Sequence, residues 1–164
     1  MRFVLKGLKI TLYFFVRLSN EVINGIIIYR ENVAVKDYSI NGSIKIYNQG
    51  SISIGENFKA NSGKNFNPIG GDTVLRLICQ KNAVLTIGDN VGMSNTTIVC
   101  SIGVTIENNV LIGGGCKIWD TDFHSLNFKI RGTKEDAVNA KNNSILIKNN
   151  AFIGGGTSIL KGVT

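Results

Sequence analysis

The fold is decided by the stretch IENNVLIGGGCKIW at residues 106–119, in which an isoleucine returns at every sixth position. The same step recurs at Ile147, Ile153 and Ile159, and an earlier, looser series covers residues 40–58. An amphipathic helix repeats near every 3.6 residues and a simple strand every 2, so neither explains this spacing. A short strand followed by a corner, three times per turn of a coil, does explain it.

Each clear repeat has glycine or a polar residue after the aliphatic one and a small or branched residue at the fifth place. This template is shared by residues 87–91, 112–116 and 153–157. We expect the aliphatic side chain to point inward, the small one to fill the corner, and glycine or asparagine to take the strained backbone. The chain has 23 Ile, 13 Val, 19 Gly and 20 Asn residues, a composition that suits strands and tight corners.

A length of 164 residues is typical of a single domain. The hydrophobic share of 43% argues against disorder. A net charge of +7 favours an anionic partner or surface. Aromatic residues make up only 8% and the lysines are scattered, so we expect no nucleic-acid partner. Three cysteines without a close pair are typical of a reduced compartment, which predicts a cytoplasmic protein.

Residues 1–30 are expected to form an N-terminal amphipathic helical segment, separate from a domain of residues 31–164. The charge-free run at residues 10–16 is too short to span a bilayer. One narrow polar stripe carries basic side chains, and the rest of the helical surface is apolar and aromatic. Such a helix packs on the body of the protein or between subunits, or it lies on a membrane surface through residues 2–18. The second alternative would place the protein at the inner face of the membrane.

From about residue 40 onward, the repeat resembles that of the hexapeptide-repeat acyltransferases. The resemblance implies an all-β fold: a left-handed parallel β-helix of triangular cross-section, here with an N-terminal helix and one long excursion loop. It also implies a homotrimer, with acetyl-CoA as acyl donor in the groove between neighbouring β-helices and with active sites built from two subunits. Family members usually continue beyond the point that matches Thr164, so we expect the chain to be truncated at its C-terminus.

The repeat is interrupted at residues 119–144, a stretch that contains the single histidine, His124. An excursion of this length from a regular solenoid is typical of a functional loop. The segment IWDTDFH at residues 118–124 resembles that of acetyltransferases of surface-polysaccharide synthesis, although many relatives have proline where this chain has Ser125. The resemblance implies that His124 is the general base that takes the proton of a sugar hydroxyl, a role that suits imidazole. A solvated loop histidine is the alternative.

Four further residues are assigned roles around His124. Asp122 is predicted to be a catalytic residue. Asp122 and Asp120 are both candidates to orient the imidazole ring. The alternative for both is that their side chains cap turns. Asp120 is also expected to bind the acceptor, together with Trp119 and Asn95. Asn95 stands where the family keeps an asparagine in the acceptor pocket, but it also fits an ordinary corner residue. Trp119 either lines the acceptor site or caps the coil.

The same family has a similar stretch at residues 152–164, and this resemblance, carried over by position, implies that Gly155, Gly156 and Thr157 contact the pantetheine arm of acetyl-CoA. Glycine suits this role because it lets a ligand approach the backbone. The alternative is that the glycines serve only as corners. Lys161 would meet a phosphate of the cofactor, or it is a surface lysine. Cys116 occupies the fifth place of a repeat and is expected to be a small core residue rather than a nucleophile.

Together these residues favour an acetyl-CoA-dependent O-acetyltransferase that acts on a sugar hydroxyl in surface-polysaccharide or glycolipid synthesis. The alternative enzyme is an N-acyltransferase on a nucleotide-linked amino sugar, whose diphosphate the positive charge would suit. The alternative without chemistry is a catalytically inactive β-helix that only binds partners or sugar. A single histidine nearly excludes a three-histidine metal site, so we expect no metal.

Overall fold

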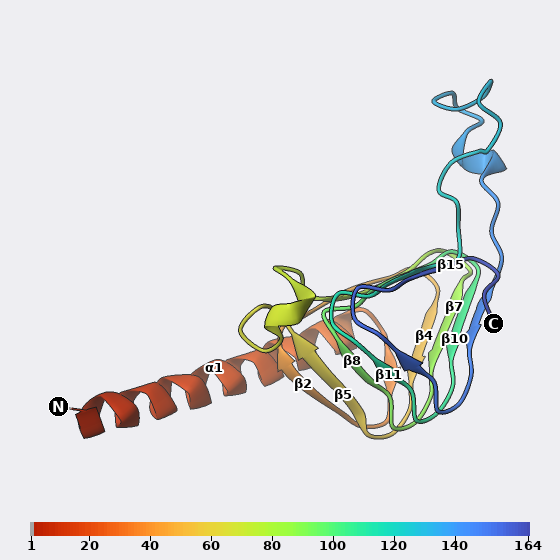
Figure 1. Cartoon of the computed structure of the whole chain (residues 1–164). Coiled ribbons are helices and arrows are strands. Elements are labelled where there is room, and N and C mark those ends of the chain that lie inside the picture. The colour runs from red at the N-terminus through yellow and green to blue at the C-terminus, as the bar shows by residue number, and fades with distance from the viewer. Residues whose placement is uncertain (1) are drawn as a thin grey trace.

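The computed structural model describes the helical backbone of residues 2–15 and both backbone and side chains of residues 16–164. One helix, α1 (Arg2–Arg30), precedes three parallel sheets of five strands each, which stack as in a parallel β-helix. Viewed along the coil in Figure 1, the three sheets form the sides of a triangle. The predicted β-helical coil with an N-terminal helix is confirmed at this level of detail.

Successive strands pass from one side of the triangle to the next, so that each sheet takes every third strand. Sheet A contains β1 (Ala34–Val35), β4 (Ser51–Ile54), β7 (Val84–Ile87), β10 (Gly103–Ile106) and β13 (Ile145–Ile147). Sheet B contains β2 (Tyr38–Gly42), β5 (Phe58–Ser62), β8 (Gly92–Ser94), β11 (Leu111–Ile112) and β14 (Phe152–Ile153). Sheet C contains β3 (Ile44–Asn48), β6 (Leu75–Cys79), β9 (Thr97–Cys100), β12 (Lys117–Trp119) and β15 (Ser158–Leu160). Each coil therefore covers the coil before it.

The inward-facing side chains form one continuous core along the axis of the coil. In sheet C, one such column consists of residues in register from successive coils, namely Leu77, Ile98, Ile118 and Ile159. All four are buried, which confirms that the aliphatic residue of each repeat points inward. Burial of one such side chain contributes about 1.5–3 kcal/mol, so these columns supply much of the stability of the stack. Cys116 is also fully buried, as its place in the repeat predicts.

The corner between sheets A and B explains why the chain is rich in asparagine. Asn57, Asn90, Asn109 and Asn150 stand at this corner in successive coils, and all have positive φ angles, between 54° and 64°. Asparagine tolerates this left-handed conformation better than most residues that carry a Cβ atom. The amides also form a ladder, with Asn57 donating to Asn90 at 2.9 Å and Asn90 donating to Asn109 at 3.1 Å. The expectation that asparagine takes the strained corner backbone is confirmed.

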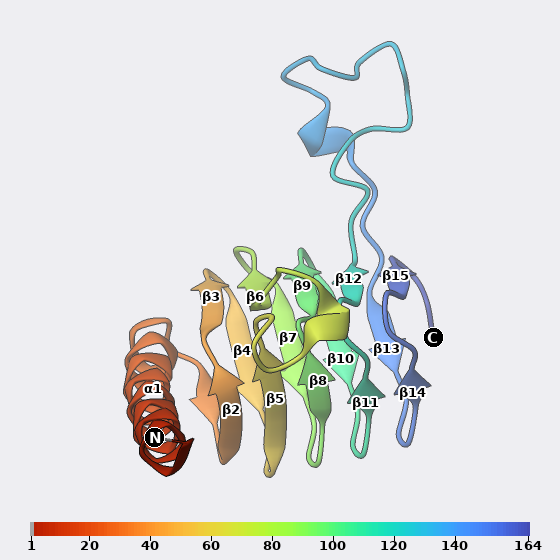
Figure 2. The ribbon, with the colours of Figure 1, turned by 60° about the vertical axis from the view of Figure 1, so that its left-hand side comes forward.

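Helix α1 covers the N-terminal end of the coil, as Figure 2 shows. Asn24 is fully buried at this contact: its Nδ2 donates to the Gly42 carbonyl at 2.8 Å, and its Oδ1 accepts from the Ile44 N–H at 3.1 Å. This part of α1 therefore packs on the body of the protein. The alternative was that residues 2–18 lie on a membrane surface. Most of these residues lie outside the part of the chain whose side chains are described. Within the described part of the chain, no helix combines the length and the apolar character that a membrane crossing needs.

Two long segments of the described chain leave the coil at its corners (Figure 2). The first, the 63–74 loop, joins β5 to β6 and contains the 3₁₀ helix η1 (Pro68–Gly70). The second, the His124 loop at residues 120–144, joins β12 to β13, contains η2 (Ala137–Asn139) and projects from the body. The His124 loop starts one residue later than the predicted excursion of residues 119–144, because Trp119 belongs to β12, and it ends at residue 144. The 63–74 loop was not predicted.

Candidate active site

The candidate active site is built on the His124 loop, which starts at the corner between sheets C and A. Asp120, its first residue, is fully buried. The Asp120 carboxylate accepts hydrogen bonds at 2.6, 2.8 and 2.7 Å from three backbone N–H groups of the turn one coil earlier, those of Ser101, Ile102 and Gly103. Asp120 therefore fastens the loop to the coil. The prediction that Asp120 binds the acceptor or orients His124 is corrected, because its buried carboxylate is fully engaged with the backbone.

His124 has a side chain that is 70% exposed, and its Nδ1 lies 2.9 Å from Oδ2 of Asp136. The Asp136 side chain is only 8% exposed. Because a carboxylate accepts hydrogen bonds and does not donate them, Nδ1 carries the proton in this pair. In the neutral ring, the lone pair of Nε2 is then free to accept a proton. An exposed imidazole that is oriented in this way has the arrangement of a general base.

Asp136 is itself held by the backbone of the loop. Its carboxylate accepts from the Ser125 N–H at 2.6 Å and from the Gly132 N–H at 2.9 Å, in addition to its contact with His124. These hydrogen bonds lower the pKa of Asp136 from 3.8 to about 2, with the Gly132 and Ser125 amides acting most strongly and His124 next. Asp136 is therefore ionised at neutral pH, and its charge would stabilise a protonated imidazole ring.

Asp122, the other predicted catalytic carboxylate, contacts a different partner. Its Oδ1 lies 3.2 Å from Nζ of Lys161, and both side chains are partly buried. Asp122 meets His124 only through the backbone, where the His124 N–H donates to the Asp122 carbonyl at 2.6 Å. The interpretation that Asp122 orients the imidazole is corrected, since Asp136 occupies that place. Lys161, expected at a cofactor phosphate, instead ties the base of the His124 loop to the corner after β15.

Trp119 ends β12 on the outward side of sheet C, immediately before the His124 loop. It therefore stands on the side of the stack rather than capping the coil. Its ring centroid is 6.5 Å from that of Phe123, which is exposed and has a positive φ of 59°. This conformation is strained for a bulky residue. The two rings form an apolar surface at the foot of the loop, and Phe123 is a residue that the sequence analysis did not single out.

The predicted cofactor residues Gly155, Gly156 and Thr157 form the corner between sheets B and C, after β14. Gly156 has a φ of 75°, and a Cβ atom there would meet nothing within 4 Å. A Cβ atom on Gly155 would lie 3.2 Å from the carbonyl oxygen of Gly114, one coil earlier, and 4.0 Å from Cγ2 of Ile69. Both glycines are exposed, so the bare backbone is open to a ligand beside the exposed side chain of Ile69.

This glycine corner and His124 lie apart within a single chain. The corner precedes β15, whereas the His124 loop starts at the opposite end of the same side of the triangle (Figure 1). With about 3.3 Å of rise per residue, the strand between Thr157 and Lys161 separates the two corners by roughly 13 Å. Within one chain, the structure therefore does not bring the glycine corner to His124, although it does pair Lys161 with Asp122.

Asn95 is fully buried and does not line an open pocket. Its Oδ1 accepts from the Gly63 N–H at 2.7 Å, and its Nδ2 donates to the Asn67 carbonyl at 2.9 Å. Its backbone φ of 46° also identifies it as a corner residue. The prediction that Asn95 binds the acceptor is corrected: its amide fastens the 63–74 loop over the corner between sheets B and C.

Besides Phe123, three features were not found from the sequence: Asp136, the 63–74 loop, and a groove on the outward face of sheet B described below. Asp136 lies in a polar stretch without a repeat, so no pattern marks it as the partner of His124. The residues that line the groove could have been found from the sequence, because side chains alternate along a strand and the neighbours of an inward-facing residue point outward. Among the residues with described side chains, no three His, Cys, Asp or Glu residues are grouped so that they could hold a metal ion.

Comparison with known proteins finds no match among family models, curated proteins or solved structures. A function must therefore follow from the geometry of this chain. The His124–Asp136 pair, the exposed glycine corner and the groove on sheet B are the three features that bear on it.

Proposed function

We propose that the protein is an acetyl-CoA-dependent O-acetyltransferase that acts on a sugar hydroxyl in surface-polysaccharide or glycolipid synthesis. The observation that carries the proposal is the His124–Asp136 pair, an exposed imidazole oriented by an ionised carboxylate on a loop that projects from a regular coil. The six-residue repeat and the segment at residues 118–124, which resemble those of the hexapeptide-repeat acyltransferases, support it. On the same grounds we infer that the coil is left-handed.

In this reaction Nε2 of His124 takes the proton of the sugar hydroxyl while the hydroxyl oxygen attacks the thioester carbonyl of acetyl-CoA. A carbon–oxygen bond forms, the carbon–sulfur bond breaks, and the proton passes from the imidazolium to the departing sulfur of CoA. Asp136 stabilises the imidazolium through the hydrogen bond to Nδ1. General-base catalysis of this kind contributes roughly 10²- to 10⁴-fold to the rate.

We further propose that three chains assemble and that each active site uses two of them. Sheet C carries an outward apolar row with one residue from each strand, in register: Tyr47, Ile78, Val99, Trp119 and Leu160. An apolar row across a whole sheet face is the kind of surface that a subunit interface covers. With the three copies of sheet C packed around a threefold axis, the His124 loop of one chain would lie beside the glycine corner of the next.

A lipid-linked acceptor is supported by the exposed side of α1. Leu18, Val22, Ile26 and Tyr29 follow one another at helical spacing, and all four are exposed. They do not take part in the contact that Asn24 makes with the coil. We propose that this stripe, with the basic residues of the helix, rests on an anionic membrane surface at the cytoplasmic face, where a glycolipid acceptor would be presented.

The test is acetyl transfer to a panel of free sugars, nucleotide-linked sugars and amino sugars, followed by the CoA thiol that is released. The cysteines of the protein, Cys79, Cys100 and Cys116, are buried and unpaired. Burial, with a smaller contribution from the charge of Asp120, raises the pKa of the Cys100 thiol. A thiol-reactive dye would therefore report CoA and not the folded protein.

His124→Ala should leave the fold intact and lower transfer about 10²- to 10⁴-fold, the contribution of a general base. Lys134→Ala, at an exposed position of the same loop, is the matched control and should retain full activity. Full turnover by His124→Ala would contradict the assignment of the base. Transfer to amino sugars in preference to hydroxyls would replace the proposal with the N-acyltransferase alternative.

A further inference from the structure

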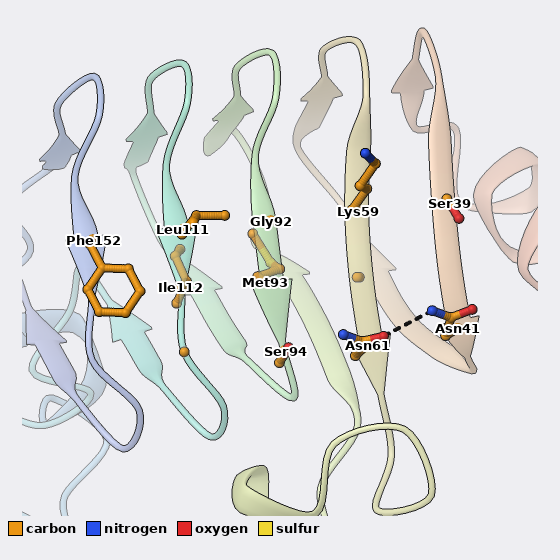
Figure 3. A pocket seen from close by; sticks show the side chains of 12 residues that line it. Ser39, Asn41, Lys59, Asn61, Gly92, Met93, Ser94, Leu111, Ile112 and Phe152 are labelled. Carbon is orange, nitrogen blue, oxygen red and sulfur yellow. Dashed lines mark hydrogen bonds between the residues drawn. The ribbon is translucent and has the colours of Figure 1, made fainter.

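A groove of about 330 Å³ crosses the outward face of sheet B, perpendicular to its strands. Figure 3 shows its lining, which comes from all five strands, from Ser39 on β2 to Phe152 on β14. Residues in the groove belong to two rows that run from coil to coil, one mostly polar and one mixed. Among the residues with described side chains, Lys59 is the only charged one in the lining.

The polar row contains Asn41, Asn61 and Ser94, which are in register on neighbouring strands. Asn41 Nδ2 donates to Asn61 Oδ1 at 3.0 Å, the bond drawn in Figure 3. The Asn41 Oδ1 acceptor and the Asn61 Nδ2 donor have no other hydrogen-bond partner among the described residues, and they lie at the two ends of this pair along the row (Figure 3). The row therefore offers donors and acceptors side by side at intervals of about 4.8 Å, the spacing of neighbouring strands.

The second row gives the groove its depth and its apolar end. Lys59, Gly92, Leu111 and Phe152 follow one another in register across four strands. A Cβ atom on Gly92 would lie 2.8 Å from Cδ2 of Leu111, so glycine keeps the middle of the groove open. At the end of the row, Leu111 and Phe152 are 54% and 76% exposed. An aromatic ring this exposed next to an aliphatic side chain offers a flat apolar surface to a ligand.

We propose that this groove binds a segment of a glycan chain that lies across the strands of sheet B. Hydroxyl groups of successive sugars would pair with the amides of Asn41 and Asn61 and with the hydroxyl of Ser94. The apolar face of one sugar ring would lie on Phe152. A lining with a single cation is a poor match for a nucleic acid or a phosphorylated ligand, whereas amides and hydroxyls match a neutral polyhydroxyl chain.

The choice of a sugar over other neutral polar ligands rests on the proposed function. The groove proposal goes beyond that function because its ligand is a glycan chain several sugars long and not a single acceptor sugar. It also replaces Asn95, whose amide is buried, with Ser94 and Asn61 as the residues that face a sugar. Because binding in the groove does not require acetyl transfer, the two proposals can be tested separately.

The test is binding of the intact protein, without acetyl-CoA, to a printed array of oligosaccharides of defined sequence, followed by calorimetry with the strongest ligand. Asn61→Ala and Phe152→Ala should each weaken binding about tenfold, because each removes one direct contact from an exposed site. The matched control is Thr105→Ala, at an outward position of β10 in sheet A, which should bind as the wild type does. His124→Ala should also bind normally.

Failure of the folded protein to bind any oligosaccharide of the array would overturn the proposal. Binding that is equally strong in Asn61→Ala and Phe152→Ala would do the same. If glycan binds in the groove but no acetyl group is transferred, the proposed function fails and this inference stands. If acetyl transfer occurs but the groove variants bind glycan as the wild type does, the proposed function stands and the groove proposal fails.

Discussion

The 63–74 loop and the His124 loop both leave the coil at a corner, but only the 63–74 loop folds back onto the body of the protein. The 63–74 loop folds back on the body, where the buried amide of Asn95 bonds to it at two points and Gly70 packs against that amide. The His124 loop is fastened at its base by Asp120 and organised internally by Asp136, and it projects from the body (Figure 2).

The His124 loop also exposes several large apolar side chains, whereas the 63–74 loop exposes one, Ile69. Leu126, Phe128 and Val138 of the His124 loop are among the most exposed large apolar residues of the described chain. A loop that leaves such residues in water contributes little apolar burial to the stability of its own chain. Changes at Asn95 and Asp120 should therefore affect the stability of the coil, whereas changes at Asp136 should affect the His124 loop alone.

The largest effect on stability is expected for Asp120→Ala. The variant leaves three partly buried backbone N–H groups without their acceptor, so we expect a loss of about 3–5 kcal/mol in the free energy of unfolding, measured with denaturant. Glu135→Ala is the matched control, because it removes an exposed carboxylate of the same loop that has no hydrogen bond or ion pair among the described residues, and it should cost about 0.5 kcal/mol or less. Equal losses in the two variants would show that Asp120 does not fasten the loop.

A smaller loss, about 2–3 kcal/mol, is expected for Asn95→Ala. The variant leaves the Gly63 N–H and the Asn67 carbonyl unpaired and places alanine at a φ of 46°. Limited proteolysis should then cut the 63–74 loop while the His124 loop behaves as in the wild type. Asn65→Ala, at an exposed position of the 63–74 loop, is the control and should change neither measurement. An unchanged cleavage pattern in Asn95→Ala would refute the anchoring role.

Lowering the pH should have the smallest effect on the stability of the coil, because the group that it protonates, Asp136, holds only the His124 loop. Because folding lowers the pKa of Asp136 from 3.8 to about 2, its contribution is complete above about pH 4 and is lost as the pH falls through about 2. Protection of the Ser125 and Gly132 amides from hydrogen exchange, relative to their intrinsic rates, should fall over this range. In Asp136→Asn, this protection should be low and independent of pH. Constant protection in the wild type would contradict the account.

The coil could be predicted because each repeat carries its own geometry in a few residues. Ile112 is buried, Gly115 takes a φ of 74°, and Cys116 fills the corner, all within one six-residue unit. The His124 loop could be located for the same reason, since a break in a regular period is visible without any knowledge of the loop itself. Neither inference needs contacts between distant residues.

The contacts inside the loops could not be predicted in this way. Asp136 is twelve residues from His124 and reaches it because Gly132, with a φ of 82°, turns the chain. Asn95 shows a different difficulty, because a corner asparagine looks the same in the sequence whether its amide binds backbone or substrate. The 63–74 loop was missed because it replaces a corner among the N-terminal coils, where the repeat is looser and has no clear period to break.

The central claim, that this chain holds acetyl-CoA for transfer, is tested most directly by titrating acetyl-CoA in a calorimeter once light scattering has established the oligomeric state. The account predicts a trimer with saturable binding at one site per chain. Gly154→Phe should abolish that binding, because a side chain there would enter the space beside the glycine corner, where a Cβ atom meets only Thr157 Oγ1 at 4.0 Å. A folded trimer that binds no acetyl-CoA would contradict the claim.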